Sequence, residues 1–354
     1  MIDLQDTTHN RYNPLSGEWV KVSPHRTKRP WQGQVEKPQK EERPHYDENC
    51  YLCPTNTRNG GEKNPDYTQQ FVFTNDFSAL LEQGSNEEVT QGPHGLLKAK
   101  GERGICKVIC FSPRHDLTLA KMAEKDIQNV ISVWAEQYTQ LGAKPFINHV
   151  QIFENRGAVM GCSNPHPHGQ IWAEETIPNI PQKELANQKA YHEAHGTSML
   201  LDYAQYEIEA KERIIFQGKK FVAVVPYWAT WPYEAMILPY HRAIQSIDAL
   251  DAEEKKDLAH VIKHLGIKFD NLFKTSFPYS MGIHQKPTDG KDYEGEIMHF
   301  HYFPPLLRSA SVKKFMVGYE MMAMPQRDIT AETAAQTLRE QADIHYLETM
   351  KEDK

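Results

Sequence analysis

The hydrophobic positions of this chain follow two periods, and the changes between them predict the order of its elements. Short segments rich in Val, Ile and Phe predict strands at "QFVFTNDF" and "GICKVICF", and again at "INHVQIFEN" and "HGQIWAEE". Between these pairs, apolar positions recur every three or four residues over 121–142. That spacing predicts a helix with one buried face, made of Ile127, Ile131, Trp134, Tyr138 and Leu141.

The same order recurs in the second half of the chain. "KKFVAVVPYW" and "EAMILPYHR" predict strands, residues 251–273 predict a helix, and "PYSMGIHQK" and "IMHFHYFPP" predict two closing strands. In both units a strand ends in Pro and His shortly before the helix, at His115 and at His241. A His-x-His pair lies in the last strand of each unit. We interpret this as a duplication of one strand–helix–strand module, with chance matching of short patterns as the alternative. The second helix should bury Leu258, Ile262, Leu265, Phe269 and Leu272.

The two ends of the chain lack this pattern. About the first 45 residues are rich in Pro, Lys and Arg, which predicts an extended arm with little regular structure. Residues 328–354 predict a terminal helix with Thr330 as its N-cap.

Composition limits the classes of partner. The chain has 354 residues, an apolar content of 39% and a formal net charge of −7, which argues against broad binding to nucleic acid. It begins without an apolar secretory signal, and no apolar run approaches the ~20 residues of a membrane span. Five cysteines, an odd number, do not suggest a disulfide framework. We therefore expect a cytoplasmic protein with no nucleic-acid or membrane partner.

The segment "GCSNPHPHGQIW" contains the first His-x-His pair, followed by a glutamine. Because residues i and i+2 of a strand face the same side, we expect His166, His168 and Gln170 to share one face. A neutral imidazole is a nucleophile near pH 7 without a separate base, and a phosphoramidate releases its imidazolium readily. The pattern favours two-step group transfer; packing or metal binding by both histidines is the alternative.

This segment resembles the active-site sequence of the galactose-1-phosphate uridylyltransferase family, the transferase branch of the histidine-triad superfamily. Hydrolase members of that superfamily carry a third histidine where this chain has Gln170. The resemblance extends to "NPDYTQQFVFTNDFSAL", "HFHYFPPLLRSASVKKFMVGYEM" and "PQRDITAE", and so covers nearly the whole chain. It implies an α+β fold of two duplicated histidine-triad-like modules, 1–178 and 179–354. In such a fold a mainly antiparallel sheet forms an open half-barrel with flanking helices.

The resemblance also implies a ping-pong reaction. His168 would take UMP from UDP-glucose and release glucose 1-phosphate, and galactose 1-phosphate would then collect the UMP as UDP-galactose. Gln170 would hold a phosphoryl oxygen, and Ser163 would contact the sugar phosphate. Because a sugar phosphate leaves as a stable anion, positioning and charge stabilisation should dominate catalysis.

Cys50 and Cys53 form a C-x-x-C pair, a weak signal that zinc sites share with redox pairs and free thiols. The resemblance supplies His115 and His166 as the remaining ligands of a tetrahedral zinc site. Four protein ligands leave no open position, so this zinc would be structural.

A second metal site is implied around the other His-x-His pair. His299 and His301 should share one strand face, and the resemblance adds Glu184 and His284. Imidazole with one carboxylate suits iron or zinc equally, so the ligands leave the identity open. Packing of the two histidines against aromatic neighbours is the alternative.

Candidate substrate contacts come from several segments. "FTNDF" combines aromatic faces with short polar groups that suit a base and a ribose, although a strand that ends in an Asx turn is the plain alternative. Arg26 and Arg29 are candidates for the diphosphate or for a solvated basic arm. The resemblance adds positions that contact phosphate or hexose, and it implies that "KFMVGYE" comes from the partner in a homodimer with shared sites. The full set is Arg26, Arg29, Asn59, Phe73, Asn75, Asp76, Phe77, Asn155, Gln170, Lys314, Phe315, Val317, Tyr319, Glu320 and Gln326.

Two other functions remain alternatives. One is a related dinucleoside polyphosphate phosphorylase or adenylyltransferase, which would prefer adenine. The other is a non-catalytic nucleotide-sugar sensor, against which the intact nucleophile and glutamine argue.

Overall fold

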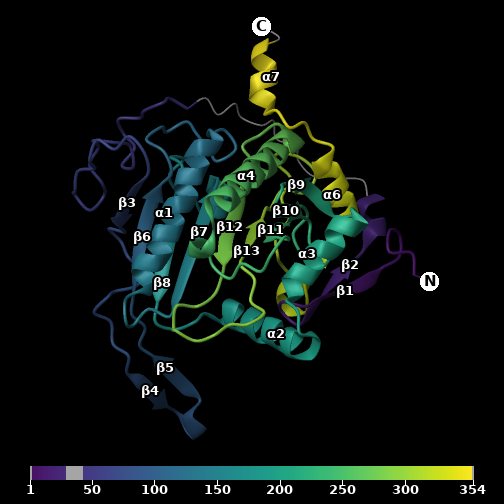
Figure 1. Cartoon of the computed structure of the whole chain (residues 1–354), viewed down its shortest axis with the longest axis horizontal. Coiled ribbons are helices and arrows are strands. Elements are labelled where there is room, and N and C mark those ends of the chain that lie inside the picture. Colours follow the sequence, from purple (N-terminus) through teal and green to yellow (C-terminus); the bar gives the residue numbers. More distant parts are fainter. Residues whose placement is uncertain (1, 29–42, 353–354) are drawn as a thin grey trace.

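A computed structural model describes residues 2–28 and 43–352 of the chain. Within these residues, nine strands form one antiparallel sheet that is open, with β3 and β9 as its edges. The order across the sheet is β3-β6-β8-β7-β12-β13-β11-β10-β9 (Figure 1). The bounds are β3 Phe71–Thr74, β6 Gly104–Cys110, β7 His149–Arg156, β8 His168–Glu174, β9 Ile214–Gln217, β10 Phe221–Val224, β11 Ala235–Pro239, β12 Tyr279–His284 and β13 His299–Phe303.

The strand order has the symmetry that a duplication requires. On one side of the centre the order is β3-β6-β8-β7, and on the other side β10-β11-β13-β12 repeats it in mirror order. The two halves join where β7 pairs with β12, from Tyr279 opposite Arg156 to Ile283 opposite Ile152. The sheet is therefore continuous across the halves, and the division at 178 and 179 stays a prediction.

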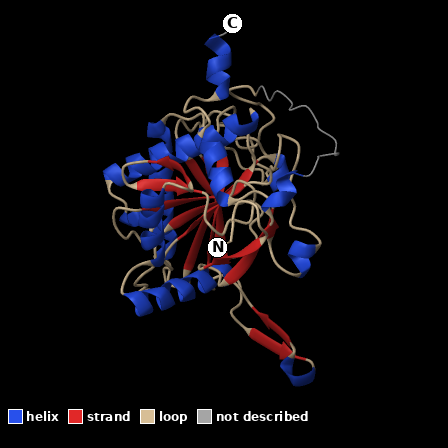
Figure 2. Ribbon diagram, turned by 90° about the vertical axis from the view of Figure 1, so that its right-hand side faces the viewer, coloured by secondary structure: helices blue, strands red, loops and turns tan. Residues whose placement is uncertain are grey.

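Two long helices cover one face of the sheet. These are α1 (Glu124–Gly142) and α4 (Ala252–Phe273), which pack against each other. Figure 2 shows the long helices on one side of the strands and mainly loops on the other. The predicted apolar faces of both helices are confirmed. They contact the strands in one core that includes Ile109, Ile152, Ile171 and Phe300. α4 begins at a capping box, in which the Asp251 side chain accepts a hydrogen bond from the Glu254 amide at 2.7 Å.

The prediction of an irregular N-terminal arm is wrong for residues 9–22. β1 (His9–Asn13) and β2 (Glu18–Val22) form a hairpin, and β14 (Gln326–Arg327) pairs with β2 in parallel. The turn depends on Gly17, whose φ of 71° is unfavourable for a residue with a Cβ atom. The hairpin is short and only partly buried, so its apolar pattern is too brief to recognise.

The predicted C-terminal helix is divided in two. Thr330 is the N-cap as expected, because its hydroxyl accepts from the Thr333 amide at 3.2 Å, but α6 ends at Arg339 and α7 spans Tyr346–Glu352. Between them the Asn271 side chain donates to the carbonyls of Ala342 at 2.9 Å and Ile344 at 2.8 Å. These tertiary hydrogen bonds replace the helical ones that a continuous helix would make.

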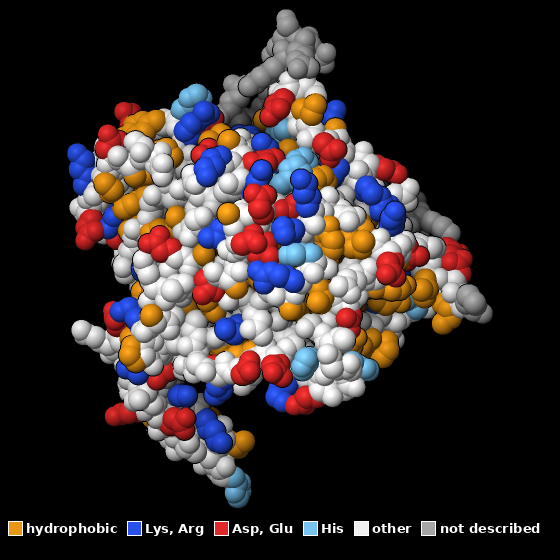
Figure 3. Space-filling model, viewed as in Figure 1, with side chains coloured by type: hydrophobic (Ala, Val, Ile, Leu, Met, Phe, Trp, Pro, Cys, Tyr) orange, Lys and Arg blue, Asp and Glu red, His pale blue; other side chains and the backbone are white. Residues whose placement is uncertain are grey.

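The remaining elements lie at the edges and ends of the sheet. A hairpin of β4 and β5 extends from the body (Figure 1), and basic and acidic side chains are interspersed on the face that α1 and α4 cover (Figure 3). No helix in the described part of the chain is both long and apolar enough to cross a membrane. The bounds are η1 Pro24–Lys28, β4 Glu88–Gln91, η2 Pro93–Gly95, β5 Leu97–Lys100, η3 Ala158–Met160, α2 Asn179–His195, α3 Met199–Ala210, η4 Ile247–Ala249 and α5 Tyr319–Met322.

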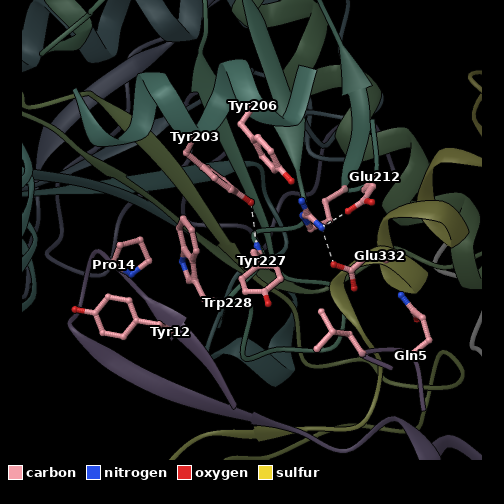
Figure 4. A pocket seen from close by; sticks show the side chains of 11 residues that line it. Gln5, Tyr12, Pro14, Tyr203, Tyr206, Glu212, Tyr227, Trp228 and Glu332 are labelled. Atoms are coloured by element: carbon pink, nitrogen blue, oxygen red, sulfur yellow. Dashed lines mark hydrogen bonds and ion pairs between the residues drawn. The ribbon is translucent and has the colours of Figure 1, made fainter. Parts of the chain in front are cut away.

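A cavity of about 620 Å³ opens beside the N-terminal hairpin, and none of the residues that line it is a predicted site residue (Figure 4). Glu332 lies at its wall and accepts hydrogen bonds from Arg11 at 2.9 Å and from Arg213 at 2.7 Å. Burial alone would raise the pKa of Glu332, but the two guanidinium groups lower it to about 2. The lining residues are Leu4, Gln5, Tyr12, Pro14, Tyr203, Tyr206, Glu212, Arg213, Tyr227, Trp228 and Glu332.

The Glu332 carboxylate should make the stability of the fold depend on pH. Its stabilising effect is complete above the ordinary pKa of 4.5 and is lost as the pH falls toward about 2. A shift of this size corresponds to about 3 kcal/mol. We expect the Glu332→Gln variant to be less stable than wild type at pH 7 and to lose less stability between pH 5 and pH 2 in denaturant titrations. The exposed Glu340→Gln variant is the control, and identical pH slopes in wild type and Glu332→Gln would contradict the assignment.

Candidate functional site

The face of the sheet opposite α1 and α4 carries the predicted chemistry. Directly paired strand residues point to the same side, so pairing registers trace this face from strand to strand. His168 is opposite Cys110 on β6, which is opposite Phe71 on β3. Gln170 is opposite Val108, which is opposite Phe73, and on its other side it is opposite Phe153.

The same face continues into the second half. Phe153 is opposite Gly282 on β12, and Gly282 is opposite His301 on β13. His284 and His299 are also opposite each other, two residues along the same strands. His168 and Gln170 therefore lie on one surface with His299 and His301, as a duplicated module requires.

His168 is the first residue of β8 and is half-buried. Its Nδ1 lies 2.7 Å from the carbonyl oxygen of His166. A carbonyl only accepts, so Nδ1 carries the proton and Nε2 keeps a free lone pair. Burial lowers the pKa of His168, which favours the neutral ring. This residue therefore has the tautomer and protonation state that a nitrogen nucleophile needs.

The prediction that His166 shares the strand face of His168 is wrong. β8 begins at His168, and His166 lies in the turn before it, where its amide donates to the Asn164 side chain at 2.9 Å. Pro167 lies between them and cannot donate a hydrogen bond to a strand ladder. Gly169 faces the opposite side of the sheet, where an added Cβ atom would lie 2.8 Å from the Phe111 ring.

Because His166 lies before the strand, its ring can face the C-x-x-C pair. The Sγ of Cys53 lies 3.6 Å from His166 Nδ1 and 3.7 Å from His115 Nδ1. Cys50 completes a buried group of four ligands whose donor atoms all lie within 4.8 Å of one another. The structure thus brings together the four residues predicted as the first metal site.

The protonation states of this group fit a cation. His166 Nε2 donates to the Ser112 carbonyl at 2.8 Å, which leaves Nδ1 as the free lone pair that faces Cys53. Burial lowers the pKa of His166 to about 3 and also lowers that of His115, so both rings are neutral ligands. Burial raises the pKa of the Cys53 thiol to about 12. A bound divalent cation would reverse that shift and hold the thiolate.

The second predicted group also assembles. Glu184 comes from α2, and its carboxylate lies 2.6 Å from His284 Nδ1, 3.4 Å from His299 Nε2 and 3.6 Å from His301 Nε2. Burial alone would raise the pKa of Glu184, but the charge and the hydrogen bond of His284, with the rings of His299 and His301 close by, hold it well below its usual value.

Buried histidine ring nitrogens without a hydrogen-bond partner indicate that this group of residues suits a metal ion. The ring nitrogens Nε2 of His299 and both of His301 are buried and make no hydrogen bond of good geometry within the described residues. His299 Nδ1 donates to the Ile297 carbonyl at 2.8 Å, so its Nε2 is a free lone pair directed at Glu184. Buried orphan nitrogens are costly, and a metal ion would satisfy them. The alternative of simple packing does not explain them.

A second cavity, of about 570 Å³, lies at the β3 edge on the site face. Phe73, Asn75 and Asp76 line it, as expected for a nucleoside site. Asn75 accepts a hydrogen bond from the Phe77 amide at 3.0 Å, so the Asx turn of the plain alternative is present within the same segment. Arg58 was not anticipated; its guanidinium lies 4.3 Å from the Phe73 ring centroid and 3.2 Å from the Asp76 carboxylate.

Other predicted contacts are more dispersed. Asn155 on β7 accepts from the Ser280 hydroxyl at 2.7 Å, and Gln170 accepts from the Trp172 indole at 3.2 Å, which leaves the Gln170 amide NH₂ free to donate. Arg26 forms an ion pair with Asp328 at 3.1 Å and is half-exposed. Arg29 lies outside the described residues. Ser163, Asn59 and Phe77 lie in loops and are exposed.

The predicted partner-subunit segment is mostly on the surface. Phe315, Val317 and Tyr319 are about half exposed. Lys314 and Glu320 form an ion pair with each other. Gln326 is instead buried in β14, where its amide donates to Asp328 at 2.7 Å.

Some residues of the site were not predicted from the sequence. Gln188 is fully buried on α2, donates to Glu296 at 2.6 Å and lies one helical turn after Glu184, a spacing that sequence reasoning could have used. Glu296, whose pKa burial raises to about 7, lies near the second group but is far from Glu184 in sequence. Tyr67 hydrogen-bonds to His166 from a loop without periodicity.

Comparison with known proteins gives one consistent family. Residues 1–178 match the family described as galactose-1-phosphate uridyl transferase, N-terminal domain, and residues 184–350 match its C-terminal domain. A galactose-1-phosphate uridylyltransferase of Haemophilus influenzae is 53% identical over 97% of both chains. One of Rattus norvegicus is 48% identical over 97% of this chain and 90% of its own length. A solved ADP-glucose phosphorylase from Arabidopsis thaliana with bound ADP-glucose shares the fold, with a TM-score of 0.75 and 22% identity over 95% of this chain and 99% of its own.

Proposed function

The chain belongs to the galactose-1-phosphate uridylyltransferase family and is a nucleotidyltransferase, and from this premise we propose that His168 is the residue that carries the nucleotide. The reaction transfers UMP from UDP-glucose to galactose 1-phosphate in galactose metabolism. The observation that supports His168 is its Nδ1 hydrogen bond to the His166 carbonyl, because this bond leaves Nε2 unprotonated and directed away from the backbone.

Both half-reactions use the same nitrogen. Nε2 attacks the α-phosphorus of UDP-glucose, a P–N bond forms, and the P–O bond to the β-phosphate breaks to release glucose 1-phosphate. The ring is then a cationic uridylyl-imidazolium whose Nδ1–H still faces the His166 carbonyl, which stabilises the positive charge. A phosphate oxygen of galactose 1-phosphate next attacks the phosphorus, the P–N bond breaks, and the lone pair returns to Nε2.

The neighbouring residues position the phosphates. The free amide NH₂ of Gln170 donates to a phosphoryl oxygen without introducing a titrating group. Ser163 and Asn155 are proposed to contact the sugar phosphate. No general acid is required, since glucose 1-phosphate leaves as a stable anion in the first half-reaction and the His168 ring leaves as a neutral imidazole in the second.

The cavity at the β3 edge is the proposed uridine site. Phe71 lies two strands from His168, about 10 Å away, which suits the distance between a base and its α-phosphate. Phe73 offers an aromatic face, while Asn75 and Asp76 offer polar groups to the base or ribose. Phe77 and Asn59, on the neighbouring loops, and Arg26 and Arg29 are proposed to complete the nucleotide contacts.

The two ligand groups are proposed metal sites of different chemistry. Cys50, Cys53, His115 and His166 suit a structural zinc ion, whose chemistry would be to fix the loop of the C-x-x-C pair to the turn before β8. Glu184, His284, His299 and His301 suit iron or zinc. His166 links the first metal site to the reaction. Its carbonyl orients the nucleophile, while its ring belongs to the zinc group.

We further propose a cytoplasmic homodimer with shared active sites. The exposed apolar side chains of Phe315, Val317 and Tyr319, next to Met321 and Met322, support an interface in this segment. In the dimer, Lys314, Glu320 and Gln326 would join Phe315, Val317 and Tyr319 near the sugar phosphate of the partner subunit.

Incubation with labelled UDP-glucose, without an acceptor, tests the proposal. We expect an acid-labile, base-stable uridylyl label that maps to His168 and leaves when galactose 1-phosphate is added. Labelled ADP-glucose serves as the control, because the fold is shared with an ADP-glucose phosphorylase. Label from ADP-glucose alone would favour the adenine-specific alternative, and binding without any label would favour a sensor.

A further inference from the structure

A third cluster of metal-ligating side chains lies on the opposite side of the sheet from both groups described above. It consists of Glu124 on α1 with His260 and His264 on α4, and the candidate donor atoms all lie within 4.8 Å of one another. All three side chains are partly exposed, so the cluster is open to solution. Histidine side chains reach the surface on this face of the molecule (Figure 3).

The helix geometry creates the cluster. His260 and His264 are four residues apart, so they lie on the same side of α4. Glu124 is in the first turn of α1, and the packing of α1 on α4 brings its Oε1 to 2.9 Å from His260 Nδ1. When two ligand atoms bind one metal ion at right angles, each with a bond of about 2.1 Å, they lie about 3 Å apart. The separation between Glu124 and His260 therefore suits two ligands of a shared cation.

Neighbouring groups hold the two rings in place. Phe216 on β9 stacks on His264 with centroids 4.4 Å apart and an interplanar angle of 13°, and its edge meets His260 at 5.3 Å. His264 Nδ1 donates to the His260 carbonyl at 2.9 Å, so its Nε2 is a free lone pair. A ring nitrogen that donates to a carbonyl while the other stays free is the usual arrangement of a histidine ligand.

We propose that Glu124, His260 and His264 bind a divalent transition-metal ion, with water in the remaining positions. Two imidazoles and one carboxylate suit Ni²⁺, Cu²⁺ and Zn²⁺ rather than the oxygen-seeking Ca²⁺ and Mg²⁺. The ion joins α1 of the first half to α4 of the second, so it stabilises the packing of the two halves. With three protein ligands and an open side, this site exchanges its metal faster than the buried four-ligand groups.

Nickel binding to the full chain, purified with its own metals, tests this site. Equilibrium dialysis against Ni²⁺ alone, with metal counted by mass spectrometry, is compared for wild type, His264→Ala and Glu124→Gln. We expect one additional nickel per wild-type chain, an affinity at least tenfold weaker in both variants, and a Ni²⁺-dependent rise in melting temperature that only wild type shows. Alanine favours helix, and glutamine keeps the size of glutamate, so both variants should fold as wild type, which circular dichroism checks.

His195→Ala is the matched control. His195 is also an exposed helical histidine, with its ring 4.4 Å from that of Tyr191 and tilted by 48°, but it belongs to no ligand cluster of the described residues. The His195→Ala variant should bind nickel as wild type does. Equal nickel binding in all four proteins, or equal loss in the His195 variant, would show that the three residues form only an ion pair and would overturn the proposal.

Discussion

Replacing His168 with glycine is expected to reduce UMP transfer by about 10⁴- to 10⁶-fold, the scale of loss when an enzyme loses its nucleophile. The free Nε2 is the atom that attacks phosphorus in the proposed reaction, and no other imidazole occupies its place on β8. Single-turnover measurements with UDP-glucose, before galactose 1-phosphate is added, isolate the step in which the P–N bond forms.

The fold should survive this change. His168 is at a strand end and half-buried, and its removal leaves the His166 ring in its own group of four ligands. Metal content and melting temperature should therefore stay close to wild type, while His195→Ala keeps full labelling. Normal transfer by the glycine variant would remove His168 as the nucleophile, whatever the family relationship.

Replacing Cys53 with serine is expected to produce the largest loss of stability. Cys53 is completely buried at the centre of its group, in contact with both histidines. Serine is a poor zinc ligand and would leave an unsatisfied hydroxyl among them. Because zinc binding contributes directly to folding free energy, we expect a loss of several kcal/mol and release of about one zinc per chain. Thermal unfolding and metal analysis measure both.

Cys106→Ser is the control for this experiment. Cys106 is equally buried but lies outside the ligand groups, so its replacement tests only the loss of a buried sulfur. Protease cleavage near the C-x-x-C loop should increase in the Cys53 variant alone. An equal fall in melting temperature for both variants, with zinc retained, would contradict the metal assignment.

The elements with strong periodicity were predictable. α1 and α4 contact the core through the spaced apolar residues that the sequence shows, and the strands predicted in both halves lie where their apolar segments place them, although β9 was not predicted. α2 was missed because its buried residues include Glu184 and Gln188, which serve the second ligand group and give no apolar period. The β1–β2 hairpin was missed because β1, with the sequence HNRYN, contains no aliphatic residue and buries Arg11 instead.

The candidate site was also predictable only in part. The spacing His-x-His-x-Gln by itself placed His168 and Gln170 on one strand face, and it paired His299 with His301. The same rule failed at His166, because Pro167 interrupts the ladder and a turn redirects the ring toward Cys53. Selecting His115, Glu184 and His284 among the possible partners depended on family resemblance.

The sequence by itself determined the local chemistry: which residues alternate on a strand, which face of a helix is apolar, and that one imidazole is followed by an amide two positions later. These properties depend on neighbours within a few residues, so a linear pattern contains them. Only the tertiary structure decided which distant residues meet, including Arg58 beside Phe73 and Glu124 beside His260. Such contacts depend on how strands order in the sheet and how α1 packs on α4, and hydrophobic burial drives that packing without specifying which polar partners it brings together.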